Sequence, residues 1–305
     1  MKFPAFEKTN MLTPAPGERL TGSPAVVLAI FFLVMTVAQS GRSVIFSAVE
    51  AILADRMNYR TALIIELFAT LSTVAVVLLY CLLAEKRSLS SLGFTKRGAF
   101  AEYGIGLVGG FLMLGGAVLL CAVCGTVTVG VTSPAPSLGI MALFLLGFLI
   151  QGMSEEMLCR SYLMVSLARG WPVWVCAVLN SLIFSLLHLG NSNVSVIALV
   201  NIFLFGLFAS LLTLRRGSIW MVGALHSMWN FAQGNLFGIP VSGIRGTPSP
   251  LSTDPAAGTW QELVNGGAFG LEGGLAVTLV LTAACAIALF MPTKKAEIAD
   301  KTNDQ

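Results

Sequence analysis

The feature of this sequence that most constrains its fold is a succession of long apolar runs. About eight such runs can be placed, near 24–40, 61–84, 100–123, 138–167, 172–188, 194–214, 218–237 and 273–291. A helix needs about 20 mainly apolar residues to cross the ~30 Å hydrocarbon core of a bilayer. Only 11% of the residues are charged, whereas soluble domains have roughly 25%. The sequence therefore predicts an all-α membrane protein, a polytopic bundle of about eight transmembrane helices.

The basic residues predict the orientation of this bundle. If each run crosses the membrane once, thirteen of the 18 Lys and Arg residues lie in loops on one side, four lie on the other, and Arg160 lies within a run. Cytoplasmic loops carry the excess of Lys and Arg, so both termini are predicted to be cytoplasmic. We expect a multi-pass membrane protein, and its short tails and compact loops suit a bacterial plasma membrane.

Three parts of the chain are predicted. Residues 1–23, with several prolines, read as a loosely ordered cytoplasmic lead-in; residues 24–291 form the transmembrane domain; residues 292–305 form a cytoplasmic tail. Apolar residues at helical spacing in 43–60 predict either a short amphipathic helix at the outer interface or an extension of the first span. The Gly-, Pro- and Ser-rich segment 238–274 is predicted to lie outside, where it either connects two spans or covers a site.

Several features favour packing over chemistry. All six cysteines lie in predicted spans, and the C-x-x-C of Cys121 and Cys124 has no second pair and no histidine nearby, so a redox or metal role is not favoured. Gly106 and Gly110 are spaced for close helix packing. The net charge is +3, without a basic patch interleaved with aromatic residues, so we expect the lipid bilayer and no nucleic acid as a partner.

Ionisable residues within the spans are few, and they carry the functional signal. An Asp, Lys or Arg at the centre of a transmembrane helix costs about 2.5 to 3.5 kcal/mol, so such residues face the bundle interior and find partners. Glu156 can pair with Arg160 one helical turn later, which leaves Glu155 free, while Glu66 has no evident partner. A free buried carboxylate beside imidazoles suits general-base activation of water. The residues that we single out are Glu66, Glu155, Glu156, Arg160 and the only two histidines of the chain, His188 and His226.

These residues have structural interpretations as well. The Glu156–Arg160 pair by itself could serve only to fix helix packing, and a single histidine in an apolar helix is often a polar contact between helices. Almost no other ionisable side chain lies in the spans, however, and Asn230 follows His226 by one helical turn on the same face. We therefore expect the set to converge on one intramembrane cavity.

Three short motifs now stand in a fixed order, each on its own predicted helix. They are "EEMLCR" (155–160), "FSLLH" (184–188) and "HSMWN" (226–230). With them the sequence resembles the CPBP family of intramembrane proteases, which includes the type 2 CAAX prenyl endopeptidases and bacterial abortive-infection and bacteriocin-immunity relatives. The resemblance covers about 60–237, with its motif core at 138–237. It implies a CAAX-type endopeptidase that cleaves a membrane-associated or lipid-modified protein or peptide substrate with glutamate-activated water.

The resemblance also implies roles for individual residues. Glu155 would be the general base, and His188 would help to hold it. His226 and Asn230 would stabilise the oxyanion, a type of contact whose loss costs ~10² to 10³ in rate in other acyl-transfer sites. The remaining motif residues, Glu156 and Arg160, would organise the site.

Zinc is the one cofactor that the resemblance brings into question. The family is often described as a metalloprotease, and Glu155, His188 and His226 are a plausible ligand set. The sequence lacks H-E-x-x-H, however, and the glutamate-dependent mechanism can be written without a metal. No other cofactor is expected.

The depth of the two histidines poses a geometric question. On straight helices, His188 lies roughly 27 Å from the cytoplasmic start of its span and His226 roughly 15 Å from its own. Tilt, a broken fifth span or a different boundary must reconcile these depths, and the site is expected at middle to outer depth.

Two other functions stay open. A non-catalytic membrane binding or immunity protein would use the same fold. A secondary transporter would use a buried Glu–Arg–His proton relay, and it would be favoured by inverted repeats with broken helices, which the sequence does not show.

Overall fold

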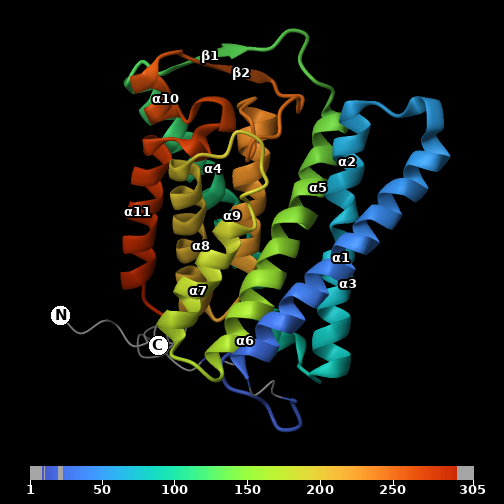
Figure 1. The fold of residues 1–305 in the computed structure, drawn as a ribbon. Coiled ribbons are helices and arrows are strands. Elements are labelled where there is room, and N and C mark those ends of the chain that lie inside the picture. Colours follow the sequence, from blue (N-terminus) through green and yellow to red (C-terminus); the bar gives the residue numbers. More distant parts are fainter. Residues whose placement is uncertain (1–8, 10, 20–22, 294–305) are drawn as a thin grey trace.

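The computed structural model describes residues 9, 11–19 and 23–293. These residues form a helical bundle with a small two-stranded sheet at one end (Figure 1). The α-helices are α1 Pro24–Leu53, α2 Tyr59–Ala69, α3 Leu71–Leu79, α4 Ala99–Val123, α5 Leu138–Glu156, α6 Val165–Ala168, α7 Val173–Leu186, α8 Val196–Arg216, α9 Trp220–Phe231, α10 Thr259–Asn265 and α11 Leu275–Phe290. Strands β1 Val127–Val131 and β2 Leu251–Pro255 pair antiparallel, with Val127 opposite Pro255.

Short turns of other helix types extend or join these elements. Segments of π-helix continue α3, α5 and α9, at Tyr80–Ala84, Met157–Met164 and Ala232–Leu236. Turns of 3-10 helix lie at Ala54–Arg56, Leu89–Leu92, Gly267–Phe269 and Leu271–Gly273. The π segment after α5 carries the chain on into α6, so that the predicted run 138–167 is one long helical unit.

The predicted fold class is confirmed. Within the described residues, five helical units are long and apolar enough to cross a membrane, and α7 and α11 are shorter apolar helices. The run 218–237 is filled by α9 and its π-helical continuation. Each of the predicted apolar runs is therefore helical, and the chain is a polytopic all-α membrane protein with a minor β pair that the sequence did not predict.

Two of the predicted boundary regions differ from expectation. Helix α1 continues to Leu53, so residues 43–60 contain no separate interfacial helix, and their extension of the first span is the correct alternative. In the lead-in, Met11 is 2% exposed and Glu18 pairs with Arg169 over 2.8 Å, which contradicts a loosely ordered segment for 11–19. The rest of 1–23, and residues 294–305 of the predicted tail, lie outside the described residues.

Glycines set the distance between the helices that carry the motifs. A Cβ atom at Gly106 or Gly110 of α4 would overlap the backbone carbonyl oxygen of Met221 or Leu225 in α9. On the other side of α9, a Cβ at Gly152 of α5 would lie 2.5 Å from Oγ of Ser227. Because only glycine lacks this atom, α9 fits closely between α4 and α5. The close-packing interpretation of Gly106 and Gly110 is confirmed.

Candidate active site

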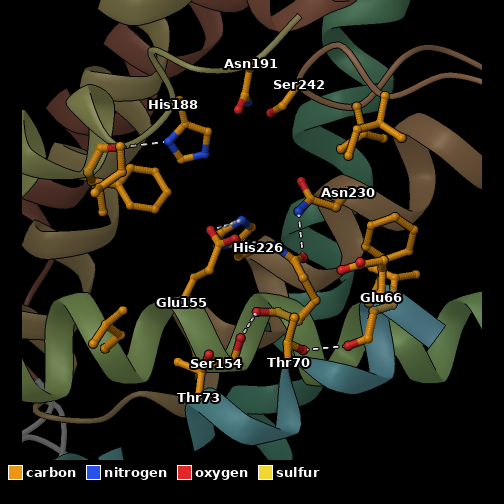
Figure 2. A pocket seen from close by; sticks show the side chains of 18 of the residues that line it. Glu66, Thr70, Thr73, Ser154, Glu155, His188, Asn191, His226, Asn230 and Ser242 are labelled. Carbon is orange, nitrogen blue, oxygen red and sulfur yellow. Dashed lines mark hydrogen bonds and ion pairs between the residues drawn. The ribbon is translucent and has the colours of Figure 1, made fainter. Parts of the chain in front are cut away.

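A cavity of about 770 Å³ lies inside the bundle, between the α1–α3 side and the α5–α9 side. The predicted site residues Glu155, His188, His226 and Asn230 all line it. Figure 2 shows Glu155 and His226 side by side, with Asn230 on the neighbouring wall and the His188 ring pointing into the cavity. The three motifs therefore meet around one space, which is large enough for a peptide segment.

Of the two adjacent glutamates, Glu155 is the one whose side chain lines the cavity. Its side chain is 34% exposed, whereas that of Glu156 is 0% exposed. Gln151 donates a hydrogen bond from Nε2 to Oε1 of Glu155 over 2.6 Å. The other carboxylate oxygen, Oε2, lies 3.7 Å from Nε2 of His226, which is too long for a direct hydrogen bond and leaves both atoms available to a bridging water.

Glu156 turns away from the cavity into a buried ionic network. Its Oε1 accepts from Nη1 of Arg160 over 3.0 Å, and both side chains are 0% exposed. Arg160 also donates from Nη2 to the carbonyl oxygen of Gly206 over 3.1 Å, and its guanidinium lies 4.5 Å from the ring centre of Phe184. The predicted Glu156–Arg160 pair is confirmed, and it joins α5 and its π-helical continuation to α7 and α8.

His226 is oriented by this network. Its Nδ1 lies 2.8 Å from Oε1 of Glu156, and a carboxylate paired with arginine can only accept, so Nδ1 carries a proton. The ring of Phe205 packs edge-on against the imidazole at 4.9 Å between centres. As a result Nε2 of His226 faces Glu155 and the cavity.

Asn230 is hydrogen-bonded to Gln151, a cavity residue that the sequence analysis did not single out. Asn230 lies one helical turn after His226, and its Nδ2 donates to Oε1 of Gln151 over 3.0 Å. Gln151 lies one turn before Glu155 on α5 and also lines the cavity. The sequence feature that indicates Gln151 is its position, because it places an amide side chain on the same helix face as Glu155 in an otherwise apolar stretch.

His188 does not make the contact expected of it. Its Nδ1 lies 2.8 Å from the carbonyl oxygen of Phe184, and no hydrogen bond or ion pair among the described residues joins it to Glu155. Helix α7 ends at Leu186, and residues 187–190 form turns. His188 therefore lies in a turn just past the end of the fifth span and lines the cavity from that end, whereas His226 lies within α9.

The expected zinc ligands do not form a metal site. Within the described part of the chain, no group of three or more His, Cys, Asp or Glu side chains is placed to hold a metal ion. Glu155 and His226 face each other, but His188 lies apart from them. The cysteines of the C-x-x-C are free thiols, Cys121 buried and Cys124 exposed. The residues present do not fit a zinc centre, and we derive no step that uses one.

Two further features complete the cavity. Glu66 on α2 pairs with Arg42 on α1, with Arg42 Nε 2.6 Å from Glu66 Oε2, and both side chains line the space. Glu66 therefore has a partner that the sequence did not reveal. From the 238–274 segment, Ser242 and Glu272 also line the cavity, and Glu272 Oε2 accepts from the backbone N–H of Ser242 over 2.7 Å. This segment covers one end of the site, as one of the two predictions for it proposed.

Comparison with known families agrees with this geometry. Residues 137–232 match the family model described as type II CAAX prenyl endopeptidase Rce1-like. The matched segment contains all three motifs and so confirms the family resemblance that they predict. At the level of the family, it supports a CAAX-type intramembrane protease. A search of curated proteins gave no match.

Proposed function

We propose that the protein is an intramembrane endopeptidase that hydrolyses a peptide bond of a membrane-associated or lipid-modified protein or peptide, using water activated by Glu155. The observation that carries this proposal is the juxtaposition of Oε2 of Glu155 and Nε2 of His226, 3.7 Å apart at the wall of the cavity. A carboxylate that is partly exposed inside an apolar bundle is positioned to act on water rather than to stabilise the fold.

The hydrolytic step follows from these positions. Oε2 of Glu155 takes a proton from a water molecule while the water oxygen attacks the carbonyl carbon of the scissile bond. The carbonyl oxygen becomes an oxyanion within reach of Nδ2 of Asn230, whose second N–H is not used by Gln151. Glu155 then returns the proton to the amide nitrogen as the carbon–nitrogen bond breaks, and the products are a carboxylic acid and an amine.

The protonation of His226 determines its part in this step. With the Nδ1 proton donated to Glu156, the neutral ring presents a lone pair at Nε2 and helps to hold the attacking water. A doubly protonated ring instead presents an N–H at Nε2 and stabilises the oxyanion. We assign His226 to oxyanion stabilisation together with Asn230, in the form in which Nδ1 donates to Glu156 and Nε2 carries a second N–H toward the cavity.

The lining of the cavity also favours a membrane-associated substrate. One part of its wall is apolar, with Leu67, Phe144 and Phe148, while the wall around Glu155 is polar. Such a cavity suits a peptide that carries apolar side chains or a lipid group beside the bond to be cut. We propose the bacterial plasma membrane, with both termini cytoplasmic, as its location.

The proposal is tested by single-turnover cleavage of a quenched fluorescent peptide library in nanodiscs. We expect Glu155→Gln to lower the cleavage rate by about 10² to 10⁴, the usual contribution of a positioned general base. The Glu155→Gln protein in the same nanodiscs should unfold at the wild-type temperature. Cleavage by Glu155→Gln at the wild-type rate would overturn the proposal. It would also be overturned if the wild-type protein cleaved no peptide while the Glu155→Gln variant kept its biological activity in cells. The second result would favour a binding or immunity protein.

A further inference from the structure

Gln151 is the only residue that contacts both Glu155 and Asn230 among the hydrogen bonds of the described chain. Its Nε2 lies 2.6 Å from Oε1 of Glu155, and its Oε1 lies 3.0 Å from Nδ2 of Asn230. Glu155 belongs to α5 and Asn230 to α9, so one amide group joins the two helices at the cavity wall. Neither the motifs nor the family match assigns a role to this residue.

The two contacts fix the orientation of the Gln151 amide. Nδ2 of Asn230 can only donate, so the Gln151 atom that faces it must be the oxygen. The amino group of Gln151 then necessarily faces Glu155, where it meets a carboxylate oxygen that accepts. Each contact therefore enforces the other, and a reversed amide would break both.

This arrangement distinguishes the two oxygens of Glu155. Oε1 is held by Gln151, whereas Oε2 is the atom that lies 3.7 Å from Nε2 of His226. Proton transfer from water can therefore use Oε2 without losing the bond that holds the carboxylate. On the other side, the bond from Asn230 to Gln151 leaves one N–H of Asn230 to point into the cavity.

We infer that Gln151 is a positioning residue, which fixes the carboxylate of the base and the amide of the oxyanion donor relative to each other. The inference rests on the proposed function, because it gives Gln151 a role in that reaction. Gln151 does not act on the reacting atoms itself. Its loss should lower kcat and leave KM nearly unchanged, since the bound substrate stays in place while the base and the donor lose their common orientation.

Two substitutions separate positioning from space filling. Gln151→Leu removes both hydrogen bonds, whereas Gln151→Glu keeps the shape and the acceptor for Asn230 but replaces the donor to Glu155 with a second carboxylate. We expect each to lower kcat by about 10 to 100-fold, with KM within about twofold of wild type, in line with the effect of small misplacements in active sites. Gln261→Leu on α10, outside the cavity lining, is the matched control and should cleave as the wild type does.

A double variant tests the link to Asn230. If Gln151 acts by orienting Asn230 and Glu155, the kcat loss of Gln151→Leu combined with Asn230→Leu should be smaller than the product of the two single losses. A wild-type kcat for Gln151→Leu, or a loss found only in KM or in thermal stability, would overturn the inference. Glu155→Gln in the same series keeps the two proposals apart. If Glu155→Gln abolishes cleavage while Gln151→Leu keeps the wild-type kcat, only the role of Gln151 fails; if cleavage does not depend on Glu155, the proposed function fails and this role with it.

Discussion

His226 and Glu156 form the link between the cavity and the ionic network behind it: Nδ1 of His226 lies 2.8 Å from Oε1 of Glu156. The same oxygen accepts from Arg160 over 3.0 Å. Two neighbouring glutamates thus have separate tasks, because Glu155 faces the cavity and Glu156 holds a buried arginine and an imidazole.

Replacing Glu156 should therefore damage stability, and replacing Glu155 should not. Glu156→Gln leaves the guanidinium of Arg160, 0% exposed, without its counter-charge. Breaking a buried ion pair in this way typically costs about 3 to 5 kcal/mol. We expect a large drop in the thermal unfolding temperature of Glu156→Gln in detergent. Glu155→Gln, at a side chain 34% exposed, should unfold as the wild type does. Equal unfolding temperatures for the two variants would contradict this division of tasks.

The contact between α4 and α9 gives a second prediction. Gly106→Ala or Gly110→Ala places a methyl group where the carbonyl oxygen of Met221 or Leu225 lies, and backbone cannot move aside as a side chain can. We expect both variants to be less stable and less active, because α9 carries His226 and Asn230. Gly115→Ala on the same helix is the control, since no atom lies within 4 Å of its added Cβ. Thermal unfolding and cleavage should both separate the two groups; wild-type behaviour of Gly106→Ala would show that α4 and α9 are not packed this closely.

Much of this site could be predicted from the sequence, for a physical reason. An ionisable residue in a lipid-embedded helix is costly, so Glu155, Glu156 and Arg160 stand out against their apolar surroundings. The pairing of Glu156 with Arg160 follows from helical spacing alone, because the two residues are i and i+4. The meeting of His226 with Glu155 followed from the scarcity of polar residues, which leaves few arrangements that satisfy them all.

Other parts could not be predicted, because their partners are distant in sequence or carry no charge. Glu66 pairs with Arg42, which lies 24 residues away on another helix, and no local spacing indicates that pair. Gln151 is neutral and therefore not conspicuous in a list of ionisable groups. The predicted fifth run, 172–188, ends only two residues beyond α7, but its spacing does not indicate that Nδ1 of His188 lies against the carbonyl oxygen of Phe184 instead of against Glu155.

The Arg42–Glu66 pair leads to a third prediction. It joins α1 and α2 at the cavity wall, and the side chains are 35% and 38% exposed. Such partly solvated pairs are usually worth about 0.2 to 1 kcal/mol. A double-mutant cycle with Arg42→Gln and Glu66→Gln should therefore give a small coupling energy in unfolding experiments, and each single variant should stay folded. A coupling as large as that of the Glu156–Arg160 pair would mean that the cavity is dry at this wall.

The orientation of the bundle gives the last prediction, which depends on one thiol. Cys124 is exposed and follows the last residue of α4, at the end of the bundle where β1 begins, whereas Cys81, Cys121, Cys159 and Cys176 are buried and Cys285 lies half-buried within the apolar helix α11. If the excess of basic loops is cytoplasmic, this end faces outward. A membrane-impermeant maleimide should then label the protein in intact cells, and Cys124→Ser should abolish the labelling. Labelling that appears only after the cells are made permeable would place Cys124 on the cytoplasmic side and reverse the proposed topology, while leaving the geometry around Glu155 unchanged.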